Sequence, residues 1–414
     1  MELRKVKLGE ICNVNARSIQ KDSFEGDIQY LDTSNLTEGT ISQLQEIAIA
    51  KAPSRAQRLV SDETILFSMV RPNQKHFGIL SNPPENMVVS TGFATLDIKD
   101  KTHYYPAYVY YLLTQESVVN YLQTLAEGSV SAYPSINPSD IANISFAIPE
   151  YTVQRKIGKL LSDIDRKIAL NRRMNATLEA MARQLYDYWF VQFDFPDAHG
   201  KPYKSSGGKM TWNNQLKRDI PEGWSVERLD DICVFRNGIN YSKDERGSQY
   251  KIVNVRNISS TTILLDNEDF DVITVPQKRA INYILKPEDI IIARSGCPGS
   301  PRLLLTSNDV LFCGFIICCS PIKQLIRNYL FYCLKQLEGT NATISGGSIL
   351  KNVSQDTLKE IHTIVPADGT LYAFNKITEN LFSKMLACAM ENKKLTRLRA
   401  TLLPLLMNGQ VGVE

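Results

Sequence analysis

The sequence predicts an α+β protein in which one mixed α/β domain occurs twice, each copy followed by a long helix. Three observations lead to this fold class. The chain repeats itself at a spacing of about 220 residues, each copy contains short apolar runs separated by Gly and Pro, and each copy ends in a segment with apolar residues at helical spacing. A period of this length is too long for a solenoid, so it indicates two whole domains and an internal pseudo-two-fold repeat.

The repeat is visible in short stretches that match in order along the two halves. KLGEICNVNAR matches RLDDICVFRNG, and YVYYLL matches YLFYCL. ETILFSMVRP and DIIIARSGCP match as strands that run into a basic residue and a turn, so Arg71 and Arg294 fall at about the same place. VVSTGFATLDI matches VLFCGFIICCS, which places Gly92 on Gly314. The halves agree at apolar, Gly and Pro positions and differ in polar loops, which is typical of one scaffold carrying two recognition surfaces.

The repeat and the composition of the intervening segment predict five parts. The segment between the halves is rich in Gly, Pro, Ser and charge, so we expect a linker or an extended surface segment there. The predicted parts are a first domain (1–150), a first long helix (151–191), this linker (192–222), a second domain (223–367) and a second long helix (368–414).

Each long helix carries a narrow apolar stripe with the three-and-four spacing of a heptad. We predict that the two helices pack on each other, although each stripe could instead cover its own domain. Asn171 interrupts the first stripe and would fix the register of the pair. The predicted helix-contact and partner-contact residues are Ile157, Leu161, Ile164, Ile168, Leu178 and Leu185 in the first helix and Ile377, Leu381, Leu395, Leu398 and Leu402 in the second.

The sequence contains no recognisable catalytic or metal-binding constellation. There is no GxxxxGK[ST] phosphate loop, and the eight cysteines and four histidines include no CxxC pair, so we expect no metal site. The NPPE stretch that starts at Asn82 resembles an adenine methyltransferase motif, but Glu85 stands where that motif needs an aromatic residue. A Pro-Pro turn between strands is the better interpretation. These features point to a binding protein rather than an enzyme.

The composition fits a globular protein with reduced thiols in the cytoplasm. The chain is 43% hydrophobic and 22% charged, with a net charge of +3, which is too mild to identify a nucleic-acid partner by itself. The N-terminus lacks the apolar core of a signal peptide. The most apolar run, Val310 to Cys319, is shorter than the ~20 residues of a membrane span, so we predict a buried strand there and no membrane association.

Two diverged domains joined by long helices suit a ligand that is itself two-fold in shape but not in sequence. Duplex DNA has this property, because its backbone is two-fold symmetric while its base sequence need not be. The differing loops carry Arg, Lys, Asn, Ser and Tyr, which bind phosphates and base edges. The sequence therefore favours a protein that binds two different DNA half-sites.

The chain also resembles the specificity subunit of type I restriction–modification systems over nearly its whole length. The central stretch from Leu185 to Ile232 is similar to the family's conserved central region, and the stretch from IPEYTVQRKIGKLL to QLYDYWF is similar to its conserved helix. ILFSMVRPN resembles a strand common in the family's recognition domains. The resemblance implies two target recognition domains for a bipartite, asymmetric site, and an antiparallel coiled coil that fixes the spacer between the half-sites.

The same resemblance implies partners and cofactors. The subunit itself is expected to be non-catalytic. It would dock two methylation subunits that hold S-adenosylmethionine and flip adenines. Two restriction subunits that use ATP and Mg would join for cleavage where they exist. No cofactor is expected in this chain.

The family supplies no fixed DNA-contact motif, so the candidate DNA-binding residues rest on chemistry and position in the loops. Arg71 and Arg294 lie at similar places in both repeats and are predicted to contact phosphate, so Arg71→Ala should weaken binding to all sequences alike. Asn73 and Tyr241 differ between the halves and are better candidates for base contacts. The full set is Arg17, Lys21, Arg71, Asn73, Lys75, Ser129 and Tyr133 in the first domain and Arg236, Asn237, Tyr241, Lys243, Arg294, Arg302, Ser348, Lys351 and Asn352 in the second.

Two alternatives remain open at this point. The chain could be a DNA adenine methyltransferase, in which case the purified protein alone would bind S-adenosylmethionine. It could instead be a coiled-coil interaction protein without a DNA role, and would then fail to bind duplex DNA even beside a methylation subunit.

Overall fold

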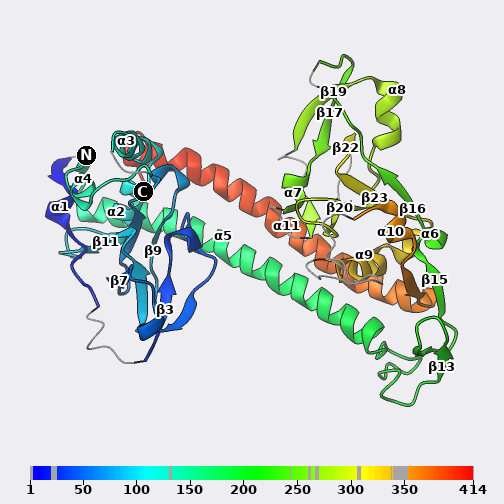
Figure 1. Cartoon of the computed structure of the whole chain (residues 1–414). Coiled ribbons are helices and arrows are strands. Elements are labelled where there is room, and N and C mark those ends of the chain that lie inside the picture. Colours follow the sequence, from blue (N-terminus) through cyan, green and yellow to red (C-terminus); the bar gives the residue numbers. More distant parts are fainter. Residues whose placement is uncertain are drawn as a thin grey trace. The chain divides into compact units, whose positions relative to one another are not determined.

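A computed structural model of the chain describes residues 3–19, 26–129, 133–242, 244–259, 263–265, 270–304, 309–336, 338 and 353–413. The chain forms two compact units, one of Met1–Arg172 with Met390–Glu414 and one of Arg173–Ala389. Each unit therefore contains one mixed domain together with parts of both long helices, α5 (Tyr151–Tyr186) and α11 (Asp368–Met407) (Figure 1). The expected plan of two tandem α+β domains with long helices is confirmed.

The first unit contains two four-stranded sheets and a short strand pair. The strands of one sheet occur in the order β2–β11–β8–β9 and those of the other in the order β6–β3–β10–β7, while β1 pairs with β12. In the second sheet β10 runs parallel to β3 and antiparallel to β7. The bounds are β1 Arg4–Lys7, β2 Cys12–Val14, β3 Asp27–Leu31, β6 Gln45–Ala48, β7 Ala56–Leu59, β8 Ile65–Ser68, β9 Phe77–Ile79, β10 Met87–Ser90, β11 Phe93–Ile98 and β12 Ser145–Ile148. A further short pair is formed by β4 (Leu36–Thr37) and β5 (Thr40–Ile41).

The second unit repeats this topology with local changes. Its five-stranded sheet has the order β16–β23–β20–β21–β18, its three-stranded sheet the order β19–β17–β22, and β15 pairs with β24. As in the first unit, the three-stranded sheet has one parallel pair, β17 with β22. The bounds are β15 Ser225–Arg228, β16 Cys233–Asn237, β17 Ser248–Val253, β18 Leu264–Leu265, β19 Asp271–Val275, β20 Ile290–Ala293, β21 Pro301–Leu304, β22 Val310–Phe312, β23 Ile316–Pro321 and β24 His362–Val365.

Two details of the predicted strands and linker change. The apolar run from Val310 to Cys319 is not one strand, because a turn around Gly314 divides it between β22 and β23, which belong to different sheets. The segment predicted as a linker is packed rather than extended. It contains the hairpin of β13 (Met210–Asn213) and β14 (Arg218–Pro221), and its Phe195 ring stacks on Trp224 with ring centroids 4.9 Å apart.

The sheet register fixes which residues of the two units are structurally equivalent. In the first unit Cys12 pairs with Ile98, and in the second Cys233 pairs with Pro321, so β11 and β23 superpose with Phe93 on Ile316. Gly92 therefore corresponds to Phe315 rather than to Gly314, and the alignment made from sequence was wrong by one residue here. Gly92-Phe93 and Gly314-Phe315 match in sequence but not in structure, because the loops before β11 and β23 differ in length.

Short helices in each unit begin in the same way. Helices α1 (Leu8–Ile11) and α6 (Leu229–Ile232) both have a capping box in which an acidic side chain at the third helical position accepts from the backbone N–H of the capping residue. Helices α2 (Pro106–Leu113) and α9 (Arg327–Lys335) carry the matching Tyr-rich stretches. The remaining helices include α3 (Glu116–Glu127), α4 (Pro138–Ala142), α7 (Val255–Ser259), α8 (Gln277–Ala280) and α10 (Gln355–Lys359).

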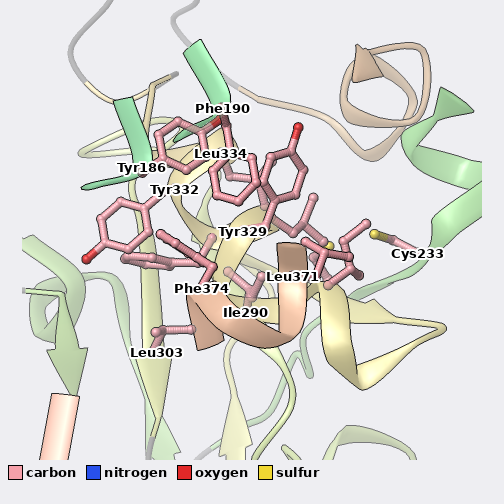
Figure 2. Close-up of a cluster of buried hydrophobic side chains, with 14 of the residues drawn as sticks. Tyr186, Phe190, Cys233, Ile290, Leu303, Tyr329, Tyr332, Leu334, Leu371 and Phe374 are labelled. Carbon is pink, nitrogen blue, oxygen red and sulfur yellow. The ribbon is translucent and has the colours of Figure 1, made fainter. Parts of the chain in front are cut away.

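Each unit has a core that joins its sheets to segments of the long helices. In the second unit an aromatic cluster contains Tyr186 at the end of α5, Phe190 from the π-helix η5 (Asp187–Val191) that follows it, Tyr329 and Tyr332 from α9, and Phe374 from α11 (Figure 2). The Phe190 and Phe374 rings lie 4.9 Å apart at nearly a right angle, a favoured edge-to-face geometry. In the first unit Leu406 and Met407 at the end of α11 are buried in the core built around α2 and β11.

Within each unit, residues that come later in α5 contact residues that come earlier in α11. In the first unit Asn171 contacts Asn392, and Asp165, further back along α5, contacts Arg399, further along α11. In the second unit the side-chain amide of Asn175 donates to the Met385 carbonyl at 3.1 Å. Tyr186, further along α5, contacts Phe374, further back along α11.

Candidate nucleic-acid interface

Arg17 and Arg236, both predicted to bind DNA, hold the same kind of internal polar cluster in their respective units. The Arg17 guanidinium lies 3.2 Å from the Asp97 carboxylate, and the Thr64 hydroxyl donates to that carboxylate at 2.6 Å. The Arg236 guanidinium lies 3.0 Å from the Asp289 carboxylate, which also accepts a hydrogen bond from a serine hydroxyl. A carboxylate–guanidinium pair of this kind supports the fold of the sheet edge. The DNA role of both arginines stays a prediction.

The Arg236 cluster is the more buried of the two. The Asp289 side chain is only 1% exposed, and the Arg236 guanidinium also contacts the Cys318 sulfur at 3.3 Å and the Phe312 ring at 5.7 Å. Burial raises the pKa of the Cys318 thiol to about 12, so the sulfur meets the guanidinium as a neutral thiol. The partly exposed guanidinium therefore contacts several groups of its own unit.

Arg302 and Arg294 are also engaged within the second unit. Arg302 is 6% exposed, and its guanidinium donates to the Glu338 carboxylate at 3.0 Å and to a backbone carbonyl. The Arg294 guanidinium donates to the Gly314 carbonyl at 3.2 Å, while its own carbonyl accepts from the Val353 amide. A buried ion pair leaves Arg302 poorly placed for a ligand in this conformation, whereas Arg294 is partly accessible.

The most continuous group of predicted residues in the first unit is the turn between β8 and β9. Arg71 precedes a single 3-10 turn (Pro72–Gln74), and Lys75 follows it, with both flanking residues in the left-handed backbone region. The backbone N–H of Asn73 donates to the side-chain oxygen of Gln123 on α3 at 3.2 Å, which holds the turn against that helix. Gln123 was not predicted, because a helix-surface glutamine carries no sequence signal for this contact.

Two further predicted residues border this turn. The Tyr133 ring is 59% exposed and lies under the Arg71 guanidinium, 4.9 Å from ring centroid to the guanidinium carbon. The Ser129 hydroxyl accepts from the Ser135 amide at 3.4 Å, so Ser129 supports the segment that carries Tyr133. Lys75 forms an ion pair with Glu38 at 3.4 Å, which is exposed enough to break when an anionic ligand approaches. The structure thus brings Arg71, Asn73 and Tyr133 to one surface, which we call the Arg71 turn.

Two exposed residues of the second unit lie after β16 or at its end. Asn237 ends the strand with an exposed side chain, and Tyr241 is 38% exposed in the following loop. The loop is held by Glu245, whose carboxylate accepts from the Ser242 amide and from Arg279. These hydrogen bonds lower the pKa of Glu245, so it stays ionised at neutral pH. Arg279 is a supporting residue that the sequence did not single out.

Five predicted DNA-binding residues lie outside the described residues, namely Lys21, Lys243, Ser348, Lys351 and Asn352.

The predicted helix stripes agree with the buried faces in part. Ile157, Leu161, Ile164, Ile168 and Leu178 are buried, and Leu185, Leu381, Leu395 and Leu402 are partly buried. Ile377 and Leu398, however, are 40% and 47% exposed. The buried face of α11 instead uses polar positions such as Thr378, whose hydroxyl bonds to the side chain of Asn328 and to the helix backbone. A stripe defined by apolar residues alone misses such positions.

Neither a metal cluster nor a membrane helix occurs in the part of the chain that the structure describes. No group of three His, Cys, Asp or Glu side chains there could hold a metal ion. No helix in that part combines the length and the apolar character needed to cross a bilayer. The Asn-Pro-Pro stretch forms a turn between β9 and β10, in which the backbone amide of Asn82 donates to the Asp62 carboxylate.

Comparison with known proteins identifies a family that matches both halves of the chain. The family described as "Type I restriction modification DNA specificity domain" matches residues 2–180 and 221–393. The chain is 23% identical to the type I restriction enzyme HindI specificity subunit of Haemophilus influenzae over 461 aligned residues, which cover 99% of each chain. It is 24% identical to the MjaIX specificity subunit of Methanocaldococcus jannaschii over 427 residues, which cover 100% of this chain and 94% of the relative.

A solved structure shares the fold. The type I restriction–modification S subunit from M. genitalium superposes with a TM-score of 0.59 at 17% sequence identity, covering 98% of this chain and 96% of the other. At this identity the likeness supports the fold alone.

Proposed function

The chain belongs to the type I restriction–modification DNA specificity family, and from this premise we propose that its two domains bind the two halves of a bipartite, asymmetric DNA site. The observation that carries the proposal is the family match over both halves, residues 2–180 and 221–393. The two units share their sheet topology and differ in the loops at the sheet edges, as expected when one scaffold serves two DNA sequences. The methyltransferase and coiled-coil alternatives are not favoured.

The long helices have a separate role in this proposal. The opposed contacts of α5 and α11 within each unit support an antiparallel coiled coil that fixes the spacer between the half-sites. The two helices are 36 and 40 residues long, so at ~1.5 Å per residue they extend over one to two turns of DNA. Apolar side chains that stay exposed on both helices, such as Met181 and Ile377, are available to partner subunits.

The chemistry of the complex is assigned to other chains. We propose that this subunit is non-catalytic and binds no cofactor of its own, and that two methylation subunits supply S-adenosylmethionine. Restriction subunits that use ATP and Mg would complete a complex that cleaves DNA. The complex would act in the cytoplasm. Titration of the purified chain with S-adenosylmethionine, alone and with a methylation subunit, tests the assignment. Binding by the chain alone would contradict it.

The experiment that tests the function is a map of adenine methylation across the genome. Cells that carry the chain with its methylation subunit are compared with cells that lack only this chain. The expected result is one split motif, methylated on opposite strands and lost on deletion. Unchanged methylation in cells with an active methylation subunit would refute the function.

A further inference from the structure

The backbone of Arg71 adopts a conformation that side chains disfavour. Its φ angle is 48°, in the left-handed region, where a Cβ atom crowds the following carbonyl oxygen. Contacts of Arg71 and of the residue before it fix this conformation. The Arg71 amide donates to the Pro134 carbonyl at 2.9 Å, and the neighbouring Val70 forms a β-bridge with Ser135. An arginine is thus kept in a position that suits glycine.

The second unit has a glycine at the equivalent position. Phe93 pairs with Ser68 and Ile316 pairs with Ala293, and because Phe93 and Ile316 are equivalent, Ser68 corresponds to Ala293. Counting onward, Arg71 corresponds to Gly296, whose φ angle of 76° is also left-handed.

Hydrogen bonds beside this position support the same register. The Met69 amide donates to the Gly92 carbonyl at 2.8 Å, and the Arg294 amide donates to the Phe315 carbonyl at 2.9 Å. Arg294 is therefore the equivalent of Met69, two positions away from Arg71. Arg71 and Arg294, predicted to lie at about the same place in the two repeats, are therefore not strict equivalents, and their phosphate contacts stay a prediction.

The Arg71 side chain is positioned but not neutralised. Its guanidinium lies over the exposed Tyr133 ring, and it has no hydrogen bond or ion pair among the residues that the structure describes. Other arginines of the first unit have carboxylate partners, as Arg17 has in Asp97 and Arg55 has in Asp32. Stacking on an aromatic ring holds the planar guanidinium in one orientation and leaves its N–H donors free.

We propose that Arg71 is a specificity-determining residue that recognises a guanine in the half-site bound by the first domain. The inference rests on the proposed function. The guanidinium is a bidentate donor pair that fits the O6 and N7 acceptors of guanine in the major groove, and the Tyr133 ring beneath it limits the orientations that it can take. The residue occurs in one repeat only, as expected for a contact that distinguishes one half-site from the other. A phosphate contact requires neither the strained backbone nor the aromatic support.

The test measures binding of the complex of this chain with its methylation subunits to duplexes of the methylated motif. The reference duplex is compared with duplexes changed at single base pairs of the first half-site. In the wild-type complex, one G·C pair is expected to discriminate by roughly 5- to 150-fold, the range of a good bidentate contact. Arg71→Gly, which takes the residue found at the equivalent position of the second unit, should abolish discrimination at that pair alone. Arg71→Lys keeps the charge without the fork and should also lose it.

Salt dependence separates the two possible contacts. For a base contact the slope of log K against log salt stays unchanged in Arg71→Gly, because the number of phosphate contacts is the same. Arg166, an exposed arginine of α5 whose side chain is 77% accessible, provides the matched control, and Arg166→Gln should change neither quantity.

Two results would overturn the inference, and they differ from each other. Uniformly weaker binding of Arg71→Gly to every duplex, with a slope reduced by about one, would make Arg71 a phosphate contact and leave the proposed function intact. A wild-type complex without any sequence preference would remove the proposed function and the inference together.

Discussion

A carboxylate and a hydroxyl have exchanged places between the two units. In the first unit Asp97 on β11 accepts from Thr64 at the start of β8, whereas in the second unit Asp289 at the start of β20 accepts from Ser320 on β23. The sheet register makes Thr64 equivalent to Asp289 and Asp97 equivalent to Ser320. Each unit thus keeps one carboxylate and one hydroxyl beside an arginine, which explains why the sequence repeat is not visible at these positions.

This exchange predicts a rescue between two substitutions. Asp289→Asn should lower the stability of the second unit by about 3 kcal/mol, because it leaves Arg236 without its buried partner. Asp97→Ser should cost the first unit less, about 1 kcal/mol, because Asp97 and Arg17 are partly exposed. Adding Thr64→Asp to Asp97→Ser recreates the arrangement of the second unit and should recover most of that loss.

Hydrogen exchange of the sheet amides in each unit measures these effects separately. The double variant could instead be less stable than Asp97→Ser by the full effect of Thr64→Asp alone. The two positions would then act independently, and the carboxylate and the hydroxyl would not be interchangeable.

At the scale of elements, the matching helices α2 and α9 place two tyrosines differently. The Tyr111 hydroxyl donates to the Asp165 carboxylate of α5 at 2.6 Å. The Tyr332 hydroxyl, at the matching position of α9, is buried and has no hydrogen-bond partner within the described part of the chain. Burial raises the pKa of both phenols, so both stay protonated.

The two phenylalanine variants are therefore expected to have opposite effects. Tyr111→Phe should destabilise the first unit by about 1.5 kcal/mol, because it removes a charge-assisted hydrogen bond. Tyr332→Phe should leave the second unit unchanged or stabilise it by up to ~1 kcal/mol, since it removes a buried hydroxyl that forms no bond. Thermal unfolding measures the overall effect, and hydrogen exchange of the sheet amides shows which unit is affected. A destabilised Tyr332→Phe variant would show that this hydroxyl has a partner in solution.

Asn171 is the polar residue most deeply placed between the long helices of the first unit. It is 1% exposed, and its amide donates to the Glu391 carboxylate at 2.7 Å and to the Asn392 side chain at 3.0 Å. Hydrogen bonds from Asn171 and from Lys167 lower the pKa of Glu391, so the acceptor is ionised at neutral pH. A buried amide with such partners fixes one helix register at some cost in stability.

Replacing this amide should weaken the fixed helix register without lowering the stability of the protein. Asn171→Leu is expected to leave the melting temperature unchanged or raised, and to relax the spacer length in the methylated motif by at least one base pair. Asn380→Leu on the exposed face of α11 is the control and should keep the spacer. Adenine methylation mapping reads the spacer directly; a single unaltered spacer in the Asn171→Leu strain would show that the register is fixed elsewhere.

At the scale of the whole molecule, the end of the chain belongs to the first unit. Residues 390–414 are grouped with Met1–Arg172, and Leu406 is 2% exposed in a core that also contains Leu8 and Leu112. The last segment of the second repeat therefore stabilises the first domain rather than the domain that precedes it in sequence.

A leucine pair on α11 tests this assignment. Leu406→Ala should destabilise the first unit by about 3 kcal/mol, through lost burial and the cavity it leaves. Leu398→Ala, at a 47% exposed position of the same helix, should change stability by less than about 0.5 kcal/mol. Faster amide exchange in β8 and β11 of the first variant is the expected signature. Faster exchange confined to β20 and β23 would place the end of α11 in the other unit.

The sequence by itself determined the duplication, the α+β class and the two long helices, because these depend on apolar periodicity and on turn residues that recur along the chain. The resemblance to the family came from particular stretches, chiefly the central one from Leu185 to Ile232. It did not determine the residue-to-residue match of the two halves. Loops of different length shift the offset, and only backbone pairing shows that Arg71 corresponds to Gly296 and not to Arg294.

Tertiary structure also decided which of the predicted DNA-binding arginines form an ion pair within their own unit. An arginine in a polar loop has the same sequence signal whether it meets a phosphate or, as Arg17 and Arg236 do, a carboxylate brought close by another strand. The same holds for α11, where buried Thr378 and exposed Ile377 are neighbours that a hydrophobic pattern ranks the wrong way round. Such choices depend on contacts between residues distant in sequence, and a local pattern contains no information about them.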